Sequence, residues 1–169
     1  MNEKIERAKR EFGKIYNDHI ERIYRFIYLK VNSKEIAEDL ASDTFLRVWK
    51  KYKGGKQEIR NVTNFLYQTA RNLVIDYYRK KGKMRIVSVE ETPLSDPKAD
   101  LEKKAIQNSD LEIIKKTLQE LKEDYQNVIL WHYVEGFSIK EIAQMMGKTE
   151  GGVRVLLSRA LKTLKTKLS

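Results

Sequence analysis

Hydrophobic residues in the first third of the chain recur three to five positions apart, as one buried stripe along an α-helix requires. The stripe comprises Ile5, Ala8, Phe12, Ile15, Ile20, Ile23 and Ile27. No segment alternates for long between apolar and polar residues, so no β-sheet is expected. The pattern therefore predicts an all-α fold.

Two further helices are expected before residue 87. Asn32 and Glu35 have the spacing of a capping box, which would open the second helix. The third helix would start near residues 61–63 and stop at Lys80–Gly82, because a cationic last turn followed by glycine is typical of a helix C-terminus. The second helix would bury a face with four-residue spacing, which comprises Ile36, Leu40, Thr44, Val48 and Tyr52.

A smaller helical unit is expected after residue 100. Its first helix, beginning near Asp100 or Asp110, would carry Leu111, Ile114, Leu118 and Leu121 at helical spacing. A buried, aromatic-rich helix, DYQNVILWHYVEG, would follow and end at Gly136.

Residues 138–160, SIKEIAQMMGKTEGGVRVLLSRA, have the spacing of a helix-turn-helix. Ala143 would lie where two helix backbones approach each other, and Gly147 would tolerate the positive φ of the tight turn. Val153 and Leu156 would anchor the second helix and leave its other face free for the major groove of DNA. The motif therefore predicts a unit that binds duplex DNA.

Charge and proline content change between the two helical units. Residues 65–85 hold six basic residues against one acid, whereas residues 86–110 hold six acids against three bases. Both prolines, Pro93 and Pro97, fall in the acidic stretch, which is typical of a linker. We expect two small helical domains, residues 1–86 and 101–169, joined by a flexible acidic linker at residues 87–100.

The formal net charge of the chain is +10, from 34 Lys and Arg against 24 Asp and Glu. A surplus of this size suits nucleic acid or an anionic membrane surface, although a lysine-rich solvated surface would give the same total. The chain contains no cysteine, no apolar signal-peptide core near its start and no apolar run of about 18 residues. A soluble, cytoplasmic protein is expected.

The residue types that most catalytic sites need are scarce. With only two histidines, His19 and His132, and no cysteine, no zinc-ligand set of ordinary spacing is present, and no glycine-rich phosphate loop is found. Glu38, Asp39 and Asp43 share a helix and could serve a metal-dependent nuclease, but the sequence offers no further ligands. We expect no catalytic, metal-binding or cofactor-binding site.

The second predicted helix carries an acidic face made of Asp39, Asp43 and Leu46, which stand four and three residues apart. An exposed leucine among carboxylates, with Arg47 beside it, suits contact with a protein partner. A solvated acidic face is the alternative.

The third predicted helix combines basic, amide and aromatic side chains. Basic groups neutralise phosphates, aromatic rings stack on unpaired bases and amides read base edges, so the combination suits single-stranded or melted DNA. Some of these residues could instead belong to the core or to a solvated surface. They are Asn64, Tyr67, Gln68, Arg71, Asn72, Tyr77, Tyr78 and Arg79.

The last predicted helix is strongly basic. Arg154, Val155, Ser158 and Arg159 are expected on the side that opposes or flanks the anchoring residues. Arginine can bind guanine through two hydrogen bonds, and the lysines near the end of the chain suit backbone phosphates.

These motifs together resemble an extracytoplasmic-function (ECF, group 4) sigma factor of bacterial RNA polymerase, in the sigma-70 family. AEDLASDTFLRVWKKY, residues 37–52, resembles sigma region 2.2, and TNFLYQTARNLVIDYYRKK, residues 63–81, is similar to regions 2.3 and 2.4. Residues 117–165 resemble region 4. The resemblance implies a non-enzymatic protein without cofactors that directs core polymerase to promoters and helps to melt the −10 element.

The resemblance also implies roles for particular residues. Contact with the β′ clamp helices of core polymerase would involve Asp39, Leu40, Asp43, Leu46 and Arg47. The melted −10 element would be bound by Lys56, Arg60, Asn61, Asn64, Tyr67, Arg71, Asn72 and Arg79. The duplex −35 element would be bound by Lys148, Thr149, Arg154, Val155, Ser158, Arg159 and Lys162. The second domain would also dock on the β flap, and an anti-sigma factor is a possible partner.

The chain departs from the family pattern at three positions. Lys122 stands where proline commonly follows leucine, Gln126 where arginine is frequent, and Gly152 where threonine often precedes the valine of the recognition helix. Gly152 lowers the helix propensity of that position by about 1 kcal/mol. A helix-turn-helix repressor or activator that binds duplex operator DNA by itself is the competing hypothesis.

Overall fold

The computed structural model describes residues 2–52, 61–87 and 109–169, and within these ranges the chain is helical without any strand. The predicted all-α fold is confirmed. The loop that contains Lys56 and Arg60 and nearly all of the predicted linker lie outside the described residues.

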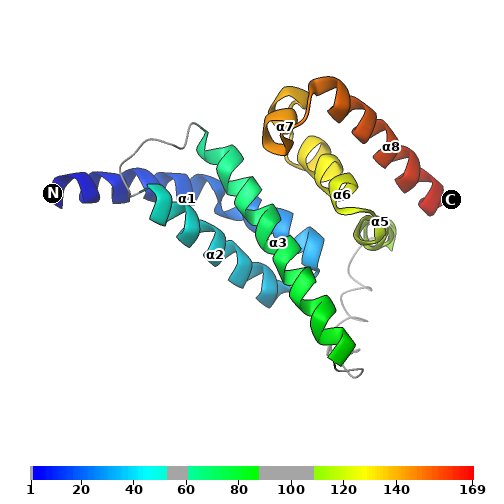
Figure 1. Cartoon of the computed structure of the whole chain (residues 1–169), viewed down its shortest axis with the longest axis horizontal. Coiled ribbons are helices and arrows are strands. Elements are labelled where there is room, and N and C mark those ends of the chain that lie inside the picture. Colours follow the sequence, from blue (N-terminus) through cyan, green and yellow to red (C-terminus); the bar gives the residue numbers. More distant parts are fainter. Residues whose placement is uncertain (1, 53–60, 88–108) are drawn as a thin grey trace.

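Three long helices form the N-terminal half: α1 (Asn2–Val31), α2 (Lys34–Tyr52) and α3 (Val62–Val87), which pack against one another in pairs (Figure 1). Ile23, Phe26 and Ile27 of α1 are fully buried, and the Phe26 ring contacts Tyr67 of α3 and Trp131 of the C-terminal half. The face of α2 that is most buried differs slightly from the predicted one, because Ile36 and Leu40 are half-buried at its edge. The residues buried on α2 are Ala37, Ala41, Thr44, Phe45 and Val48.

The predicted capping box at Asn32 is wrong by one residue. Asn32 takes a φ of 53° and ends α1, a left-handed conformation that asparagine tolerates better than most residues. Ser33 precedes the first residue of α2 instead, and its hydroxyl accepts a hydrogen bond from the Ile36 amide at 3.4 Å.

Helix α3 begins where it was predicted and ends later. The Asn61 side-chain oxygen accepts a hydrogen bond from the Asn64 amide at 3.0 Å, which caps the helix start. The predicted stop at Lys80–Gly82 is wrong, because α3 continues through Gly82 to Val87. A glycine ends a helix only when its backbone turns left-handed, and Gly82 does not.

The C-terminal half contains α5 (Ser109–Glu120), α6 (Glu123–Ile129), the π-helical turn η1 (Leu130–Val134), α7 (Ile139–Met146) and α8 (Glu150–Leu168). These helices gather on one side of the N-terminal helices, and α8 lies on the far side of the group (Figure 1). Trp131 is fully buried at the centre of the chain. Ile114, expected on the same stripe as Leu118, is 38% exposed, so that part of the prediction is wrong.

The predicted helix-turn-helix is confirmed. Ser138 and Glu141 form a capping box at the start of α7, and Gly147 ends that helix with a φ of 65°. Val153 and Ala160 are fully buried and anchor α8, while Leu157 is more deeply buried than the predicted anchor Leu156.

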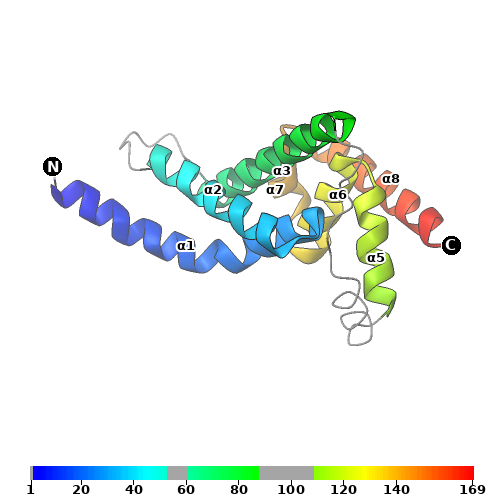
Figure 2. The same cartoon turned by 90° about the horizontal axis from the view of Figure 1, so that it is seen from below.

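The two halves of the chain contact each other directly. Helix α3 packs against α7, and α1 packs against α5; both views place the halves side by side (Figure 2). None of the described helices is both long enough and apolar enough to cross a lipid bilayer.

Candidate nucleic-acid interface

Helix α8 presents an exposed basic face. Val155 is 50% exposed on this face although it is apolar, which leaves its methyl groups available for a thymine methyl group. Arg154 lies 3.8 Å from Glu150, a solvated ion pair too weak to fix the guanidinium. All the residues predicted to bind the −35 element are exposed: Lys148, Thr149, Arg154, Val155, Ser158, Arg159 and Lys162.

Thr149 also has a structural role at the start of α8. Its hydroxyl oxygen accepts a hydrogen bond from the Gly152 amide at 3.0 Å, so Thr149 is the N-cap of the helix. A β-carbon built at residue 152 would lie 3.1 Å from this oxygen. Glycine at 152 therefore leaves room for the cap.

Helix α3 exposes only part of its predicted DNA-binding face. Asn61, Asn72 and Arg79 are exposed, and Arg79 lies 3.5 Å from Asp76 in a solvated ion pair. Asn72 and Arg79 can contact another molecule without any rearrangement of the chain, whereas the side-chain oxygen of Asn61 already caps α3.

The remaining predicted residues of α3 are less exposed, and Tyr67 and Arg71 contact the C-terminal half. Asn64 and Arg71 are half-buried, and the neighbouring Gln68 donates a hydrogen bond to the Met145 carbonyl of α7 at 2.9 Å. Tyr67 has no exposed surface, so the expectation of an exposed aromatic ring at this position is wrong for this arrangement. Its ring meets Phe26 and Phe137 edge-on, with centroid distances of 5.5 Å and 4.9 Å.

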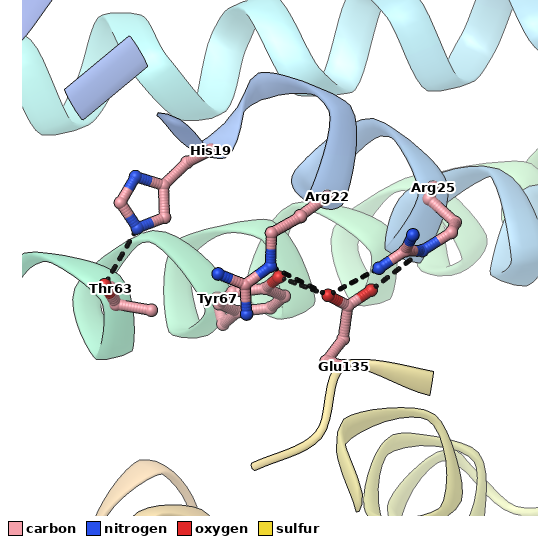
Figure 3. Close-up of polar contacts among 6 residues, drawn as sticks. All are labelled: His19, Arg22, Arg25, Thr63, Tyr67 and Glu135. Carbon is pink, nitrogen blue, oxygen red and sulfur yellow. Dashed lines mark hydrogen bonds and ion pairs between the residues drawn. The ribbon is translucent and has the colours of Figure 1, made fainter. Parts of the chain in front are cut away.

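Glu135 joins the two halves through a cluster of polar contacts that also includes Arg22, Arg25 and Tyr67, called here the Glu135 cluster (Figure 3). The Arg25 guanidinium donates to both carboxylate oxygens, at 3.2 and 3.0 Å, and Arg22 Nε donates at 3.3 Å. The Tyr67 hydroxyl donates at 2.8 Å. The carboxylate is therefore fully paired, as a Glu135 side chain with only 1% exposure requires.

The environment of the Glu135 cluster shifts the pKa of Tyr67. Burial, and next the adjacent Glu135 carboxylate, raise the pKa of Tyr67 well above its usual value. Tyr67 therefore remains a hydrogen-bond donor throughout the physiological pH range.

The local backbone places Glu135 at this junction. After the π-helical turn η1, the Glu135 amide donates to the Leu130 carbonyl at 2.9 Å. Gly136 then takes a φ of 75°, which reverses the chain so that Phe137 returns toward Trp131. The turn thereby directs Glu135 toward α1 and Phe137 toward Tyr67.

A second charged contact joins α1 to α6. Lys30 is buried, and its ammonium group donates to the carboxylate of Glu123 and to the side-chain oxygen of Asn127. Its Nζ also lies 5.1 Å from the centre of the Phe26 ring. Burial lowers the pKa of Lys30 to about 8, although Glu123 opposes that shift.

The predicted polymerase-binding face of α2 is largely accessible. Asp39 and Arg47 are exposed, Asp43 is half-buried, and Arg47 lies 3.3 Å from Asp43. Leu40 is half-buried and packs against the core, so it offers less surface than predicted.

Leu46, on the same helix, is 51% exposed. It borders an open apolar hollow of about 520 Å³ between α1 and α2, which Phe12, Tyr16 and Trp49 also line. Apolar side chains in an open hollow are typical of a surface that meets another protein.

Both histidines have structural contacts. His19 contacts the Ile15 carbonyl and the Thr63 hydroxyl, each at 2.8 Å (Figure 3), and His132 Nδ1 donates to the Phe137 carbonyl at 2.9 Å. Within the part of the chain that the structure describes, no group of three or more His, Asp or Glu side chains could hold a metal ion.

Sequence reasoning missed the residues that join the two halves: Arg22, Arg25, Lys30 and Glu135. The partners of Glu135 on α1 lie 110 and 113 residues away in sequence, a separation that no local pattern reveals. The one available signal is an acidic residue next to Gly136, directly after an apolar run.

The fold and these surfaces define a two-part helical DNA-binding protein. Comparison with known protein families identifies the family to which it belongs. The family model for sigma-70 region 2 matches residues 15–84, and the model for sigma-70 region 4 matches residues 111–164. Together these matches cover well over half of the chain, so the chain belongs to the sigma-70 family of RNA polymerase sigma factors, in its ECF group.

Two relatives illustrate the similarity. The chain is 31% identical over 160 residues to the ECF RNA polymerase sigma factor SigM of Bacillus subtilis, with 89% of this chain and 91% of SigM covered. It is 29% identical over 169 residues to the ECF RNA polymerase sigma factor BldN of Streptomyces coelicolor. That match covers 97% of this chain but 64% of BldN, so the chain spans less than two thirds of that relative.

Two solved structures share the fold. The sigma factor RpoE in complex with the anti-sigma factor NepR from Bartonella quintana aligns with a TM-score of 0.71 at 23% identity, over 94% of this chain and 96% of that one. CnrH in complex with the cytosolic domain of CnrY also aligns with a TM-score of 0.71, at 21% identity, over 98% of this chain and 94% of that one.

Proposed function

We propose that this chain binds core RNA polymerase, directs it to promoters and promotes melting of the −10 element. Helix α8 reads the −35 element as duplex DNA, and α3 binds the separated −10 strand. The chain acts in the cytoplasm, with polymerase and chromosome, and has no catalytic activity of its own. Membership of the sigma-70 family supports each part of this proposal.

The exposed face of α8 is the observation that carries the proposal. Its side chains combine arginine, a hydroxyl and an apolar valine, which together can distinguish base pairs in the major groove. Lys148 and Lys162 flank this face at positions suited to backbone phosphates. The opposite side of α8 is buried, so only this face can enter a groove.

Contact with polymerase is assigned to α2. The carboxylates of Asp39 and Asp43 beside the exposed Leu46 would meet the β′ clamp helices, and the apolar hollow next to Leu46 adds surface for that partner. Region 4 would dock on the β flap. An anti-sigma factor that holds the chain inactive is a further candidate partner.

The domain division is also a proposal. Residues 1–86 would form the polymerase-binding and −10-binding domain, and residues 101–169 the −35-binding domain, with residues 87–100 as an acidic linker. The two segments matched by family models, residues 15–84 and 111–164, fall within these bounds.

In vitro transcription on pooled promoter DNA, with and without bacterial core polymerase, tests the proposal. New start sites that require both the chain and core polymerase are the expected result, and their alignment would give the −35 and −10 sequences. Tight binding of duplex operator DNA by the chain alone, with no new transcripts, would instead support a conventional helix-turn-helix regulator.

A further inference from the structure

Helix α8 carries a buried and an exposed row of residues with the same spacing. Val153, Leu157 and Ala160 form the buried row, which anchors the helix. The exposed row begins two residues earlier. Because two residues correspond to about 200° around a helix, it lies opposite the buried row and forms the centre line of the face proposed to enter the major groove. The members of the exposed row are Gly151, Val155, Ser158 and Lys162.

Side-chain length increases along this exposed row. Gly151 has no side chain, the next two members have short ones, and Lys162 has a long, charged one. A helix with this gradient can bring its first turn closer to the base pairs than its later turns, where the Lys162 ammonium group still reaches a backbone phosphate. The first turn of α8 is therefore expected to lie deepest in the groove, as the beginning of a recognition helix commonly does.

No feature of the described chain requires glycine at residue 151. The backbone does not require it, because the described glycines with positive φ are Gly136 and Gly147. Packing does not require it either: apart from adjacent residues and the backbone of α8, no described atom lies within 4 Å of a β-carbon added there. Glycine inside a helix is destabilising relative to alanine. Gly151 therefore lowers the stability of α8 without a compensating contact in the chain, which indicates that the gap serves a partner.

The surroundings of Gly151 favour a base edge over a phosphate group. Val155 follows one turn later, is 50% exposed and offers methyl groups. Glu150 precedes Gly151 and is exposed, with Arg154 3.8 Å away. A carboxylate repels a phosphate but accepts a hydrogen bond from the amino group of cytosine or adenine, and arginine binds guanine in the same groove. The gap is therefore bordered by groups that suit base edges.

The apolar group that base edges present in the major groove is the C5-methyl group of thymine. A methyl group seated on the Gly151 α-carbon would also contact Val155, because β-carbons four residues apart in a helix lie about 5–6 Å from each other. From these observations we infer that Gly151 and Val155 form a notch for one thymine methyl group of the −35 element, called here the methyl notch. Gly151 is thus a specificity-determining residue, an inference that rests on the proposed function of α8.

Replacement of thymine by uracil, which removes only the C5-methyl group, tests the methyl notch. Alignment of the start sites used by the polymerase holoenzyme gives the −35 element, and each thymine of either strand is then replaced singly. One replacement should weaken binding by the holoenzyme about fourfold, as expected when one buried methyl group is lost. In Gly151→Ala the added methyl group occupies the notch. Binding to the thymine duplex should then be weaker, and the same replacement should change the affinity less than about twofold.

Gly152→Ala is the matched control, because it adds the same methyl group one residue further along α8. Its β-carbon would lie 3.1 Å from the Thr149 hydroxyl and away from the exposed row. The effect of uracil should persist in this control. Lys162→Ala removes the charged end of the row, so it should weaken binding to thymine and uracil duplexes alike. Urea unfolding should show that Gly151→Ala is at least as stable as the parent chain, which excludes loss of the fold as the cause of weaker binding.

Two outcomes would overturn the methyl notch. The first is that no single uracil replacement weakens binding by the parent chain, because a bound thymine methyl group must then be absent. The second is that Gly151→Ala retains the full effect of uracil, or weakens binding to both duplexes equally. The gap at Gly151 would in that case face another part of the DNA, such as the phosphate backbone.

The outcomes separate this inference from the proposed function. Duplex sites can also be selected by the full chain without polymerase, so the uracil comparison does not require transcription. A chain that directs no new start sites, yet shows a Gly151-dependent uracil effect on selected duplexes, would refute the proposed function and leave the methyl notch standing. A chain that directs transcription from promoters whose −35 thymines all tolerate uracil would refute the methyl notch alone.

Discussion

Phe26 of α1 and Trp131 of η1 lie stacked across the junction of the two halves, with ring centroids 5.7 Å apart and an interplanar angle of 25°. Both side chains are fully buried. The apolar centre of the chain is thus shared between region 2 and region 4, and the Glu135 and Lys30 contacts lie beside it.

This stacking should appear as an energetic coupling. An aromatic pair contributes about 0.5–1.5 kcal/mol beyond the area that it buries. In a double-mutant cycle of Phe26→Leu and Trp131→Leu, measured by urea unfolding, a coupling energy of that size is expected. Phe26→Leu with Phe45→Leu is the control cycle and should give a coupling near zero. Equal couplings in the two cycles would show that the stacked contact is not formed in solution.

The stability of the protein should depend on the ionisation of Lys30. Its pKa is about 8 in the folded chain, because of burial, against 10.5 for an unperturbed lysine. Between these values the unfolded state binds more protons, so the free energy of unfolding should rise with pH. From pH 8 to 9.5 the gain should approach about 2 kcal/mol, since one pKa unit corresponds to 1.36 kcal/mol.

Urea unfolding at several pH values measures this effect. The Lys30→Met variant has no titrating group at this position, so its free energy of unfolding should not show this rise with pH. The pH series stays below 9.5 because the raised pKa of Tyr67 has the opposite consequence near pH 10, where an unfolded tyrosine ionises first. Parallel pH profiles for the two proteins would contradict the assignment of the rise to Lys30, which faces Glu123, Asp124 and Arg71.

Features that depend on residues close together in the sequence could be predicted, whereas contacts between residues far apart in the sequence could not. The helix-turn-helix was predictable because Ser138, Ala143, Gly147 and Val153 act within one local motif. The helix boundary at Asn32 was missed by one position because asparagine and the adjacent serine are both capping residues, and only the backbone shows which role each takes.

The covered face of α3 could not be predicted in the same way. From the sequence alone, Tyr67 could be an exposed ring or a core residue. Its burial depends on contact with Phe137, which lies 70 residues later in the chain. The role of Glu135 likewise depends on Arg22 and Arg25, which are distant in the sequence and pair with its carboxylate. Contacts between the halves depend on tertiary packing, which hydrophobic periodicity does not encode.

Arg154 should contribute to sequence discrimination at the −35 element. Arg154→Ala is expected to weaken binding to a preferred −35 sequence by about 1–3 kcal/mol and to relax the preference at one base pair. Promoter DNA variants bound by the polymerase holoenzyme provide the measurement. Lys165→Ala, in the last turn of α8, should affect all sequences alike. An equal loss on every sequence for Arg154→Ala would make Arg154 a phosphate contact.

Reversing the charge of the α2 face should prevent assembly with core polymerase. Asp39→Arg with Asp43→Arg places like charges at a surface expected to meet a partner, a change that can cost several kcal/mol of binding. The fold should tolerate it, because within the described residues Asp43 pairs with the exposed Arg47 alone and such pairs contribute about 0–1 kcal/mol.

Pull-down with core polymerase and urea unfolding together measure this prediction. Asp18→Arg with Glu21→Arg on α1 makes the same change in net charge at exposed positions and should leave polymerase binding intact. Unchanged affinity in the α2 variant would remove that face from the proposed interface.

The N-terminus of α8 should respond differently to alanine at two adjacent glycines. Gly151 has no neighbouring atom within 4 Å of an added β-carbon, so Gly151→Ala should stabilise the chain by about 0.5–1 kcal/mol through helix propensity. At Gly152 the added carbon would lie 3.1 Å from the Thr149 hydroxyl that caps the helix, and crowding should cancel most of the same gain. In a Thr149→Ala background the cap is absent, so Gly152→Ala should recover its full stabilisation. Urea unfolding of the four combinations measures the coupling, and an equal gain from both glycines in the parent chain would show that the cap does not restrict residue 152.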